Sequence, residues 1–230
     1  KEVFSKETTC DKIGESWEAS AIPGGVSTIA NGEFTGLGLD EITAKYPLDI
    51  LGKIGGTEFP LCFKIIDAAD FLSVQVHPDD EVAAERYDSL GKAEIWYVMD
   101  AKPGAKIYSG FTREMSAQEF YDRCRDCTID QVLNVIEPKK GDVLFITPGT
   151  VHAADGGLLI AEIQESSDMT FRLYDWGREF NPATARKMHL DAAIDVINYK
   201  AFDPSIYRKG PLWGEESQEE DHVIQELVEC

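Results

Sequence analysis

The sequence predicts a mainly β fold, namely a β-barrel or jelly roll with helical insertions attached to it. Between residues 61 and 176, short runs rich in β-branched and aromatic residues follow one another and are separated by Gly and Pro turn signals. Segments with helical periodicity are few and lie between these runs. Short strands joined by tight turns form antiparallel sheets, which bury one face by closing into a barrel or by stacking.

The first part of the chain, residues 17–60, is rich in turn signals such as Pro23-Gly24-Gly25 and Asn31-Gly32. We expect loops and short edge strands there. One segment, LDEITAKYP, is typical of a short helix. This helix ends before Pro47, because proline disfavours the helical conformation of the residue that precedes it.

The β-rich runs begin at Leu61. Strands are expected in LCFKIIDA, FLSVQVHP, AEIWYVMDA and KIYSGF. Pro78 ends the second of them, because it lacks the N–H that a strand ladder needs. The following segment, DDEVAAERYDSLG, predicts a short helix that is closed by Gly91.

A helical insertion is expected at about residues 112–136. Ser116 followed by Glu119 is typical of a capping box, and the helical periodicity continues in two pieces around a break at Thr128-Ile129-Asp130. The insertion contains Cys124 and Cys127, which we interpret as reduced cysteines of a helix, because no second pair completes a zinc knuckle. The total of five cysteines is odd and does not fit a disulfide framework.

Further strands are expected in VLFI, VHA, GLLIAEIQ and MTFRLYDW. The segment ATARKMHLDAAIDVINY then predicts an amphipathic helix with an apolar stripe of Leu190, Ala193, Ile194 and Ile197. Residues 201–230 predict an acidic linker that turns into alternating apolar residues, as at the start of a second, truncated β-domain. Both ends of the chain therefore look cut.

The charge of the chain limits its partners. With 42 acidic and 22 basic residues, the net charge of -20 argues against binding to nucleic acids or anionic membranes, because both require a basic surface. No apolar run approaches the ~20 residues that span a bilayer, and the first residues lack the apolar core of a signal peptide. We therefore expect a folded cytoplasmic protein, whose oligomeric state the sequence leaves open.

Four side chains are candidates for one metal site. Gln75 and His77 share one face of a predicted strand, because side chains alternate with a period of two. Glu94 lies on the next strand and His152 follows a Pro-Gly turn, so a closed barrel can point all four donors inward. Two imidazoles, a carboxylate and an amide oxygen suit zinc, with manganese, iron and cobalt as competitors. The remaining histidines, His189 in a predicted helix and His222 in the acidic tail, are assigned to structure.

Several segments resemble one family. VQVHPDD, GKAEIWYVMDA, the stretch from Gly141 to His152, and TFRLYDW resemble, in order and in wording, the class I mannose-6-phosphate isomerases (phosphomannose isomerases). These are metalloenzymes with a cupin-type β-barrel or jelly roll. The resemblance extends from about Trp17 to Asn198. It implies that residues 1–200 form a cupin-type catalytic domain that contains the helical insertion.

The resemblance also implies roles for particular residues. It implies one Zn²⁺ per chain, bound by Gln75, His77, Glu94 and His152. It implies that Arg172 is a catalytic residue lining the same cavity, and that Ser73 and Lys92 are active-site positions that contact the substrate. Ser73 lies two residues before Gln75, and Lys92 two before Glu94, so each faces the same way as that ligand if the strand extends so far.

The implied reaction interconverts mannose 6-phosphate and fructose 6-phosphate through a cis-enediol, with the sugar phosphate as a small-molecule partner. It requires a Lewis acid, a base and a cationic group. Zinc fits the first role, and Arg172 fits the third because its side chain is always charged. The base stays open among Lys92, which alternatively binds the phosphate, a metal-bound water, and Asp175. Alternation disfavours Asp175, because it places Arg172 on the opposite face.

Two other functions compete with this interpretation. An iron-dependent cupin oxygenase requires two histidines, one carboxylate and open coordination positions, and Gln75 in place of a third histidine weakens it. A non-catalytic sugar-phosphate-binding cupin retains the barrel and the metal. The presence of Lys92, Glu94 and Arg172 argues against this second alternative.

Overall fold

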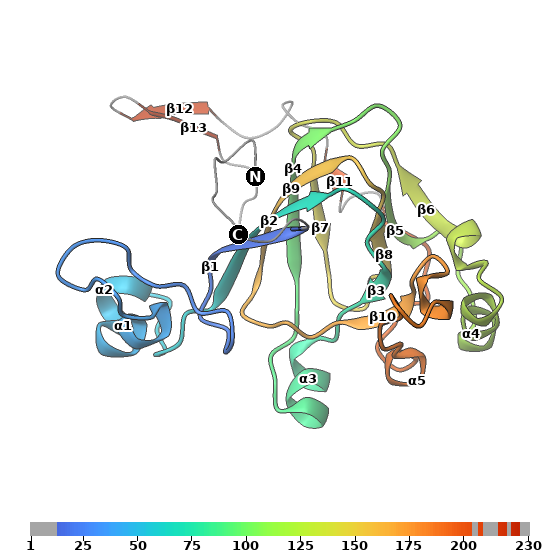
Figure 1. Cartoon of the computed structure of the whole chain (residues 1–230), viewed down its shortest axis with the longest axis horizontal. Coiled ribbons are helices and arrows are strands. Elements are labelled where there is room, and N and C mark those ends of the chain that lie inside the picture. The colour runs from blue at the N-terminus through green and yellow to red at the C-terminus, as the bar shows by residue number, and fades with distance from the viewer. Residues whose placement is uncertain (1–12, 204–206, 209–215, 220–221, 226–230) are drawn as a thin grey trace.

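The computed structural model of the chain describes residues 13–203, 207–208, 216–219 and 222–225. Two antiparallel sheets face each other (Figure 1). The six-stranded sheet contains, in spatial order, β1 (Glu15–Ala19), β2 (Leu61–Ala68), β9 (Leu158–Glu165), β4 (Glu94–Ala101), β7 (Val143–Ile146) and β11 (Tyr207–Arg208). The five-stranded sheet contains β10 (Phe171–Tyr174), β3 (Val74–Val76), β8 (His152–Ala154), β5 (Ile107–Phe111) and β6 (Leu133–Ile136). The strands β12 (Glu216–Glu219) and β13 (His222–Gln225) form a separate two-stranded sheet.

An apolar core fills the space between the two large sheets. The six-stranded sheet contributes Trp96 and Ile160, and the five-stranded sheet contributes Ile107 and Ala154. These four side chains are fully buried, and full burial of a large apolar side chain stabilises the fold by about 1.5–3 kcal/mol. The predicted mainly β fold is confirmed, and its core lies where strand alternation directs the apolar side chains.

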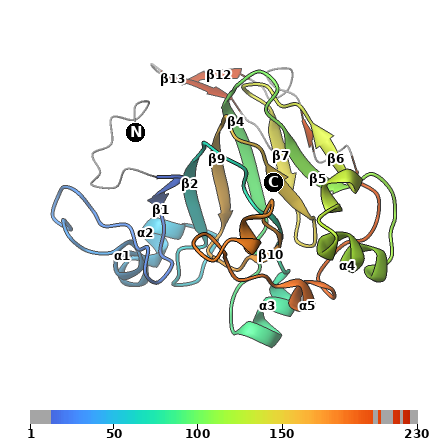
Figure 2. The same cartoon turned by 45° about the vertical axis from the view of Figure 1, so that its right-hand side comes forward.

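Helices cover the outer face of the five-stranded sheet (Figure 2). They are α4 (Ala117–Arg125), the 3-10 helix η1 (Ile129–Val132) and α5 (Leu190–Ala193). At the start of α4, Ser116 Oγ accepts a hydrogen bond from the Glu119 N–H at 3.1 Å, as the capping pattern predicts. The predicted insertion at residues 112–136 is thus mainly helical, although its last four residues form strand β6.

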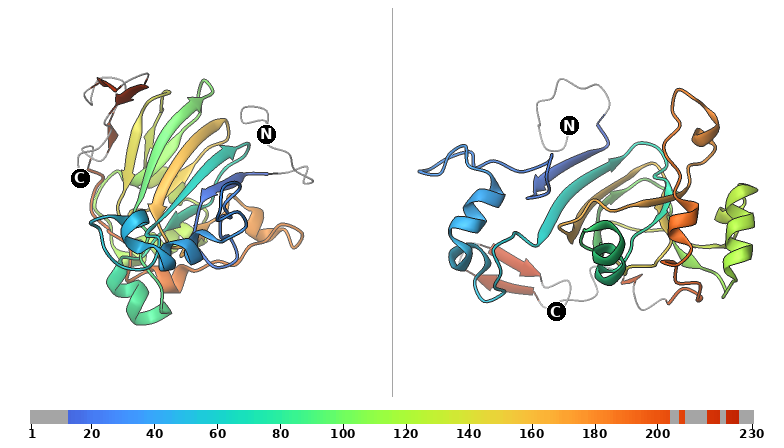
Figure 3. Two further views of the ribbon diagram at one scale, coloured as in Figure 1. Left: turned by 90° about the vertical axis from the view of Figure 1, so that its left-hand side faces the viewer. Right: turned by 90° about the horizontal axis from the view of Figure 1, so that it is seen from below.

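The N-terminal helices lie at the β1 edge of the six-stranded sheet (Figures 1 and 3). Helix α1 (Leu39–Lys45) ends before Pro47 as expected, but a second helix, α2 (Pro47–Leu51), begins at that proline. Proline is favourable at the first position of a helix, because a backbone N–H at this position would have no partner within the helix. The sequence prediction used Pro47 only as a helix end and therefore missed α2.

Helix α3 (Asp80–Tyr87) connects the two sheets between β3 and β4. Asp79 caps it by accepting a hydrogen bond from the Val82 N–H at 2.9 Å. The helix ends at Asp88, which adopts a left-handed conformation with a φ of 50°. The predicted end at Gly91 is therefore wrong by a few residues.

The predicted amphipathic helix over residues 183–199 is largely absent. Only Leu190–Ala193 form a regular helix there, and residues 181–189 form turns and irregular chain. The apolar stripe still packs as predicted at Ala193 and Ile197, which are buried under the five-stranded sheet. Residues 181–189 are instead held against β10, through an ion pair of Arg186 with Asp175 and a hydrogen bond from Arg172 to the Lys187 carbonyl oxygen.

The cysteines and the C-terminal residues are described only in part. Cys62, Cys124 and Cys127 are free thiols, as expected, whereas Cys10 and Cys230 lie outside the described residues. Strand β11 pairs with β7, but most of residues 201–230 and the side chain of His222 also lie outside the description, so the domain division stays a prediction. Among the described helices, none has the length and apolar composition required to cross a membrane.

Candidate active site

Three side chains that can bind a metal meet between the two sheets. His77 directly follows β3, Glu94 begins β4 and His152 begins β8. One ligand atom from each residue lies within 4.8 Å of the ligand atoms of the other two. All three residues are at most 1% exposed. The cluster therefore joins the six-stranded sheet, which carries Glu94, to the five-stranded sheet, which carries His152.

Backbone carbonyls orient both imidazoles. Nδ1 of His77 lies 2.8 Å from the Met169 carbonyl oxygen, and Nδ1 of His152 lies 2.9 Å from the Thr150 carbonyl oxygen. A carbonyl only accepts hydrogen bonds, so each Nδ1 carries the proton and each Nε2 keeps the lone pair that binds a metal. The Nε2 atoms of His77 and His152 lie 3.2 and 3.5 Å from the two carboxylate oxygens of Glu94.

The charges in the cluster suit a bound cation. The pKa of His77 is lowered mainly by burial and, to a smaller extent, by the charge of Lys92. The pKa of His152 is lowered to about 4, again mainly by burial and secondly by His77. Both rings are therefore neutral near pH 7. Burial by itself raises the pKa of Glu94, but Lys92 and the two histidines hold that pKa well below its ordinary value. The cluster thus consists of two neutral imidazoles and one carboxylate.

The cluster also contains polar atoms that lack hydrogen bonds. Among the described residues, Nε2 of His77 and both carboxylate oxygens of Glu94 are buried without one. The Lys92 ammonium lies 2.6 Å from Glu94 Oε1 as an ion pair. Because buried polar atoms nearly always have partners, these lone pairs indicate a metal ion, and nitrogen and oxygen donors of this kind fit zinc.

Gln75 extends the cluster from β3. It lies directly opposite His152 in the β3–β8 pair, and its Nε2 is 3.3 Å from His152 Nε2. A half-turn of the amide exchanges nitrogen and oxygen, so the carbonyl oxygen can take the same place. The structure therefore brings together all four side chains that the sequence predicts as metal ligands.

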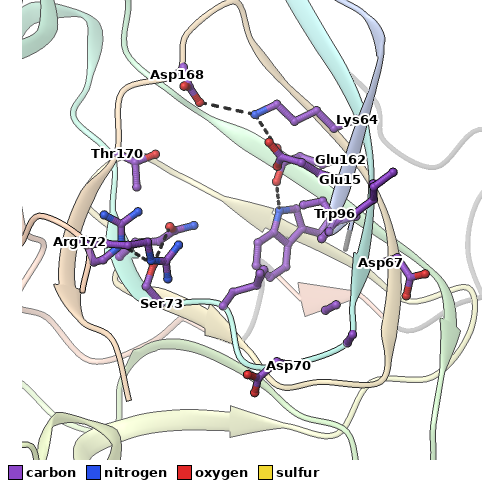
Figure 4. Close-up of a pocket in the computed structure, with 18 of the residues that line it drawn as sticks. Glu15, Lys64, Asp67, Asp70, Ser73, Trp96, Glu162, Asp168, Thr170 and Arg172 are labelled. Carbon is purple, nitrogen blue, oxygen red and sulfur yellow. Dashed lines mark hydrogen bonds and ion pairs between the residues drawn. The ribbon is translucent and has the colours of Figure 1, made fainter. Parts of the chain in front are cut away.

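A pocket of about 930 Å³ is lined by residues of both sheets, among them Trp96 and Arg172 (Figure 4). Gln75, which contacts His152, and Lys92, which contacts Glu94, connect this pocket to the candidate metal cluster. Lys92 lies two residues before β4 rather than within it, yet it is only 4% exposed. The volume falls within the usual range for small-molecule sites.

Glu162 is a pocket carboxylate that the sequence analysis missed (Figure 4). Its Oε2 accepts a hydrogen bond from Trp96 Nε1 at 2.8 Å, and its Oε1 lies 3.8 Å from Lys64 Nζ. Burial, followed by the charge of Glu94, raises the pKa of Glu162 to about 7. A carboxylate with this pKa can accept and release a proton near neutral pH.

Strand alternation in the sequence could have identified Glu162 and its partner Lys64. In β9, Ile160 and Glu162 are buried, whereas their neighbours Ala161 and Ile163 are more exposed. In β2, Cys62 and Lys64 likewise share the buried face. A charged residue on the apolar face of a strand requires a partner, and here each provides one for the other.

Arg172 and Ser73 lie in the pocket, as the sequence predicts (Figure 4). Arg172 is opposite Gln75 in the β10–β3 pair, and its Nε donates a hydrogen bond to Ser73 Oγ at 3.2 Å. Ser73 Oγ lies 3.5 Å from Gln75 Oε1. The guanidinium is therefore connected to the metal cluster through one hydroxyl group.

Asp175, a base candidate from the sequence, is held away from the pocket. It is fully buried, and the buried and half-buried residues of β10 alternate so that Arg172 faces the other way. Its carboxylate accepts hydrogen bonds from Arg178 Nη2 at 2.7 Å and from Arg186 Nε at 3.0 Å. Burial alone raises the pKa of Asp175, but the two arginines hold it below its ordinary value. Two ion pairs thus occupy this carboxylate.

His189 lies in a different setting from the one predicted. It precedes α5 instead of lying within a helix, and it lines the pocket. Its Nδ1 accepts a hydrogen bond from the Arg172 backbone N–H at 3.0 Å. This bond anchors residues 181–189 to β10, which is a structural role.

Comparisons with known proteins agree with this arrangement. The model of the phosphomannose isomerase type I catalytic domain matches residues 5–103. Mannose-6-phosphate isomerase of Streptococcus mutans serotype c is 40% identical over 194 residues, which are 84% of this chain and 61% of that protein. Mannose-6-phosphate isomerase ManA of Bacillus subtilis is 36% identical over 228 residues, which are 99% of this chain and 70% of that protein.

A solved structure has the same fold. The crystal structure of the mannose 6-phosphate isomerase from Bacillus subtilis matches with a TM-score of 0.82 and 32% sequence identity, over 94% of this chain and 67% of that one. The chain spans 61% of the length of the Streptococcus mutans relative, which is less than two thirds. The identity to ManA extends over nearly the whole chain and over more than two thirds of that protein. The chain therefore belongs to the type I phosphomannose isomerase family.

Proposed function

We propose that this chain is a zinc-dependent isomerase that interconverts mannose 6-phosphate and fructose 6-phosphate. The observation that supports this most strongly is the buried cluster of His77, Glu94 and His152 beside a pocket that also contains Glu162. An aldose–ketose isomerase requires a group that polarises two neighbouring oxygens and a base that moves a proton between two neighbouring carbons. The cluster and the carboxylate supply these two parts side by side.

The metal and the nearby cations have distinct tasks. Zinc bound by Gln75, His77, Glu94 and His152 would supply Lewis-acid polarisation of the oxygens on C1 and C2. Lys92, ion-paired with Glu94, and Arg172, held by Ser73, add two positive charges to the same part of the pocket. These charges stabilise the negative charge that develops on the enediolate, and they are already in position before the reaction begins.

Glu162 is the proposed base. It removes the proton from C2 of the open-chain aldose, and the electron pair of the broken C–H bond forms the C1–C2 double bond of the enediolate. The hydroxyl proton passes from the oxygen on C2 to the oxygen on C1, and Glu162 then returns its proton to C1 to give the ketose. The pKa of about 7 suits both the removal and the return.

Two base candidates from the sequence, Lys92 and Asp175, fit less well than Glu162. The nitrogen of Lys92 lies 2.6 Å from a carboxylate oxygen of the metal ligand Glu94, so Lys92 is engaged as a cation. Asp175 forms ion pairs with two arginines. Glu162 has a neutral donor in Trp96 and only a longer contact of 3.8 Å to Lys64.

Product analysis separates this function from its alternatives. The zinc-loaded chain is incubated with mannose 6-phosphate, and the sugar is followed by NMR. We expect fructose 6-phosphate to form, and mannose without a phosphate to react much more slowly. Binding of the sugar phosphate without any conversion would leave only a sugar-phosphate-binding protein. Oxygen consumption by the iron-loaded chain, without isomerisation by the zinc-loaded chain, would support the oxygenase instead.

A further inference from the structure

An arginine pair lines the pocket beyond the metal cluster. Arg172 projects from β10, and Arg186 lies on the segment 181–189 that runs beside this strand. The Lys187 carbonyl oxygen accepts a hydrogen bond from Arg172 Nη1 at 3.0 Å, and His189 accepts one from the Arg172 backbone N–H. These two bonds hold the segment against β10, so that Arg172 and Arg186 both line the pocket.

A buried carboxylate fixes the position of Arg186. The Nε and Nη2 groups of Arg186 both donate hydrogen bonds to the carboxylate of Asp175, which is fully buried. A guanidinium bound to a carboxylate along one edge has a defined plane and keeps its other edge available. Among the described residues, no hydrogen bond uses Nη1 of Arg186 or Nη2 of Arg172. Each arginine therefore has a free donor group.

The two arginines carry more positive charge than their surroundings neutralise. Arg172 is half-buried and has no carboxylate within 4.0 Å among the described residues, whereas Arg186 is paired with Asp175. Burial and then the charge of Arg186 lower the pKa of Arg172, which agrees with two cations held close together. Two cations that line the same pocket favour an anion that both can contact.

The opposite end of the pocket has a different balance of charges. Lys64 also lines the pocket, but its Nζ lies 3.8 Å from Glu162 and 3.8 Å from Asp168 (Figure 4). Two carboxylates beside one ammonium repel a dianion. The pocket therefore has one end that favours a phosphate and one that does not.

We propose that Arg186 binds the phosphate group of the substrate and that Asp175 is the positioning residue that holds Arg186 in place. This inference rests on the proposed function for the identity of the sugar, but the anion site itself does not depend on turnover. The phosphate is attached to C6, at the far end of the sugar from C1 and C2. Arg172 lies between the two ends, connected through Ser73 to the metal cluster and adjacent to Arg186. The sugar phosphate thus extends from the metal ligands past Arg172 to Arg186.

Binding of inorganic phosphate to the zinc-loaded full chain tests this inference without catalysis. Titration calorimetry is performed with the unmodified chain, Arg186→Gln and Arg178→Gln. Arg178 is the matched control, because it donates to the same Asp175 carboxylate but does not line the pocket. We expect Arg186→Gln to weaken phosphate binding by about tenfold to hundredfold, the range for one hydrogen-bonded charge, and Arg178→Gln to change it by less than about twofold.

Kinetics with mannose 6-phosphate provide a second measurement. Arg186→Gln should raise KM more than it lowers kcat, Arg186→Lys should restore part of the affinity, and Asp175→Asn should raise KM in the same direction. Equal losses for the two glutamine variants, or a larger loss of phosphate affinity in Lys64→Gln, would overturn the inference. An active enzyme with unchanged KM in Arg186→Gln would overturn it and leave the isomerase intact. Phosphate binding through Arg186 without any turnover would contradict the isomerase and leave the anion site.

Discussion

Glu94 and His152 belong to opposite sheets, yet Glu94 Oε2 and His152 Nε2 lie 3.5 Å apart. A metal ion held by these two residues would link the two sheets. It would also provide a partner for the carboxylate oxygens of Glu94, which are buried without a hydrogen bond and have an ion pair with Lys92. We therefore expect metal binding to stabilise the fold in addition to supplying Lewis-acid chemistry.

Substitution of His152 tests both effects. His152→Ala removes one ligand, so we expect loss of zinc and loss of activity together. In the unmodified chain, free zinc at about 100 times its Kd should add about 2.7 kcal/mol to the free energy of unfolding. Denaturant titrations with and without zinc measure this difference, which should be absent in the variant. His189→Ala is the control and should retain zinc; a His152→Ala protein that retains one zinc per chain would remove His152 from the site.

Substitution of Arg172 separates charge stabilisation from metal binding. Arg172→Ala should keep its zinc, because the side chain contacts Ser73 rather than the cluster. Its kcat should fall by about 100-fold or more, the scale for the loss of one electrostatic stabiliser. Metal analysis and initial rates on the same sample provide the check, and an unchanged kcat would refute the role.

The pH dependence of the reaction tests Glu162. A base must be ionised to act, and the pKa of Glu162 is raised to about 7, so kcat/KM should fall about tenfold for each pH unit below that value. Glu162→Gln should lower kcat by about 100-fold or more, and the residual rate should lack this dependence. Titration of the substrate phosphate is common to both proteins, so comparing the two profiles isolates the carboxylate. An identical acidic limb in the variant would rule out Glu162.

The turn at Gly149 precedes His152 in the chain and contacts the backbone of His77. Gly149 has a φ of 81°, and an added Cβ would lie 2.8 Å from the Val196 carbonyl oxygen. Its N–H donates to the His77 carbonyl oxygen at 2.9 Å, so the turn supports the site. Gly149→Ala should cost about 1–3 kcal/mol of unfolding free energy from backbone strain, and the close contact should add to this.

The matched control for this turn is Gly104→Ala. Gly104 has a similar φ of 84°, but nothing lies within 4 Å of an added Cβ. Denaturant unfolding of both variants should therefore show the larger loss for Gly149→Ala. Equal losses would mean that the close contact with Val196 is relieved by a small shift.

Strand periodicity was the most reliable guide from sequence to structure. It placed Gln75 and His77 on one face, and both side chains reach the metal cluster. It also placed Arg172 and Asp175 on different faces, and only Arg172 lines the pocket. The rule worked because a period of two is a local property of the backbone. It required no knowledge of which strands become neighbours.

The errors arose where tertiary contacts decide the local conformation. The predicted helix over residues 183–199 took its signal from the apolar stripe at its C-terminal end. Residues 183–189 are instead held against β10 by the Arg186–Asp175 ion pair and the Arg172–Lys187 hydrogen bond. Glu162 and Lys64 were missed for a related reason. Each is a charged residue on an apolar face, and only the pairing of β2 with β9 shows that the two lie together.

The central claim is that one metal at this cluster makes the chain an isomerase. The most direct test removes metal with a chelator, returns zinc in measured amounts, and records conversion of mannose 6-phosphate to fructose 6-phosphate at each step. We predict that activity rises in proportion to zinc and reaches its plateau at one zinc per chain. A chain that carries one zinc and still forms no fructose 6-phosphate would contradict the account.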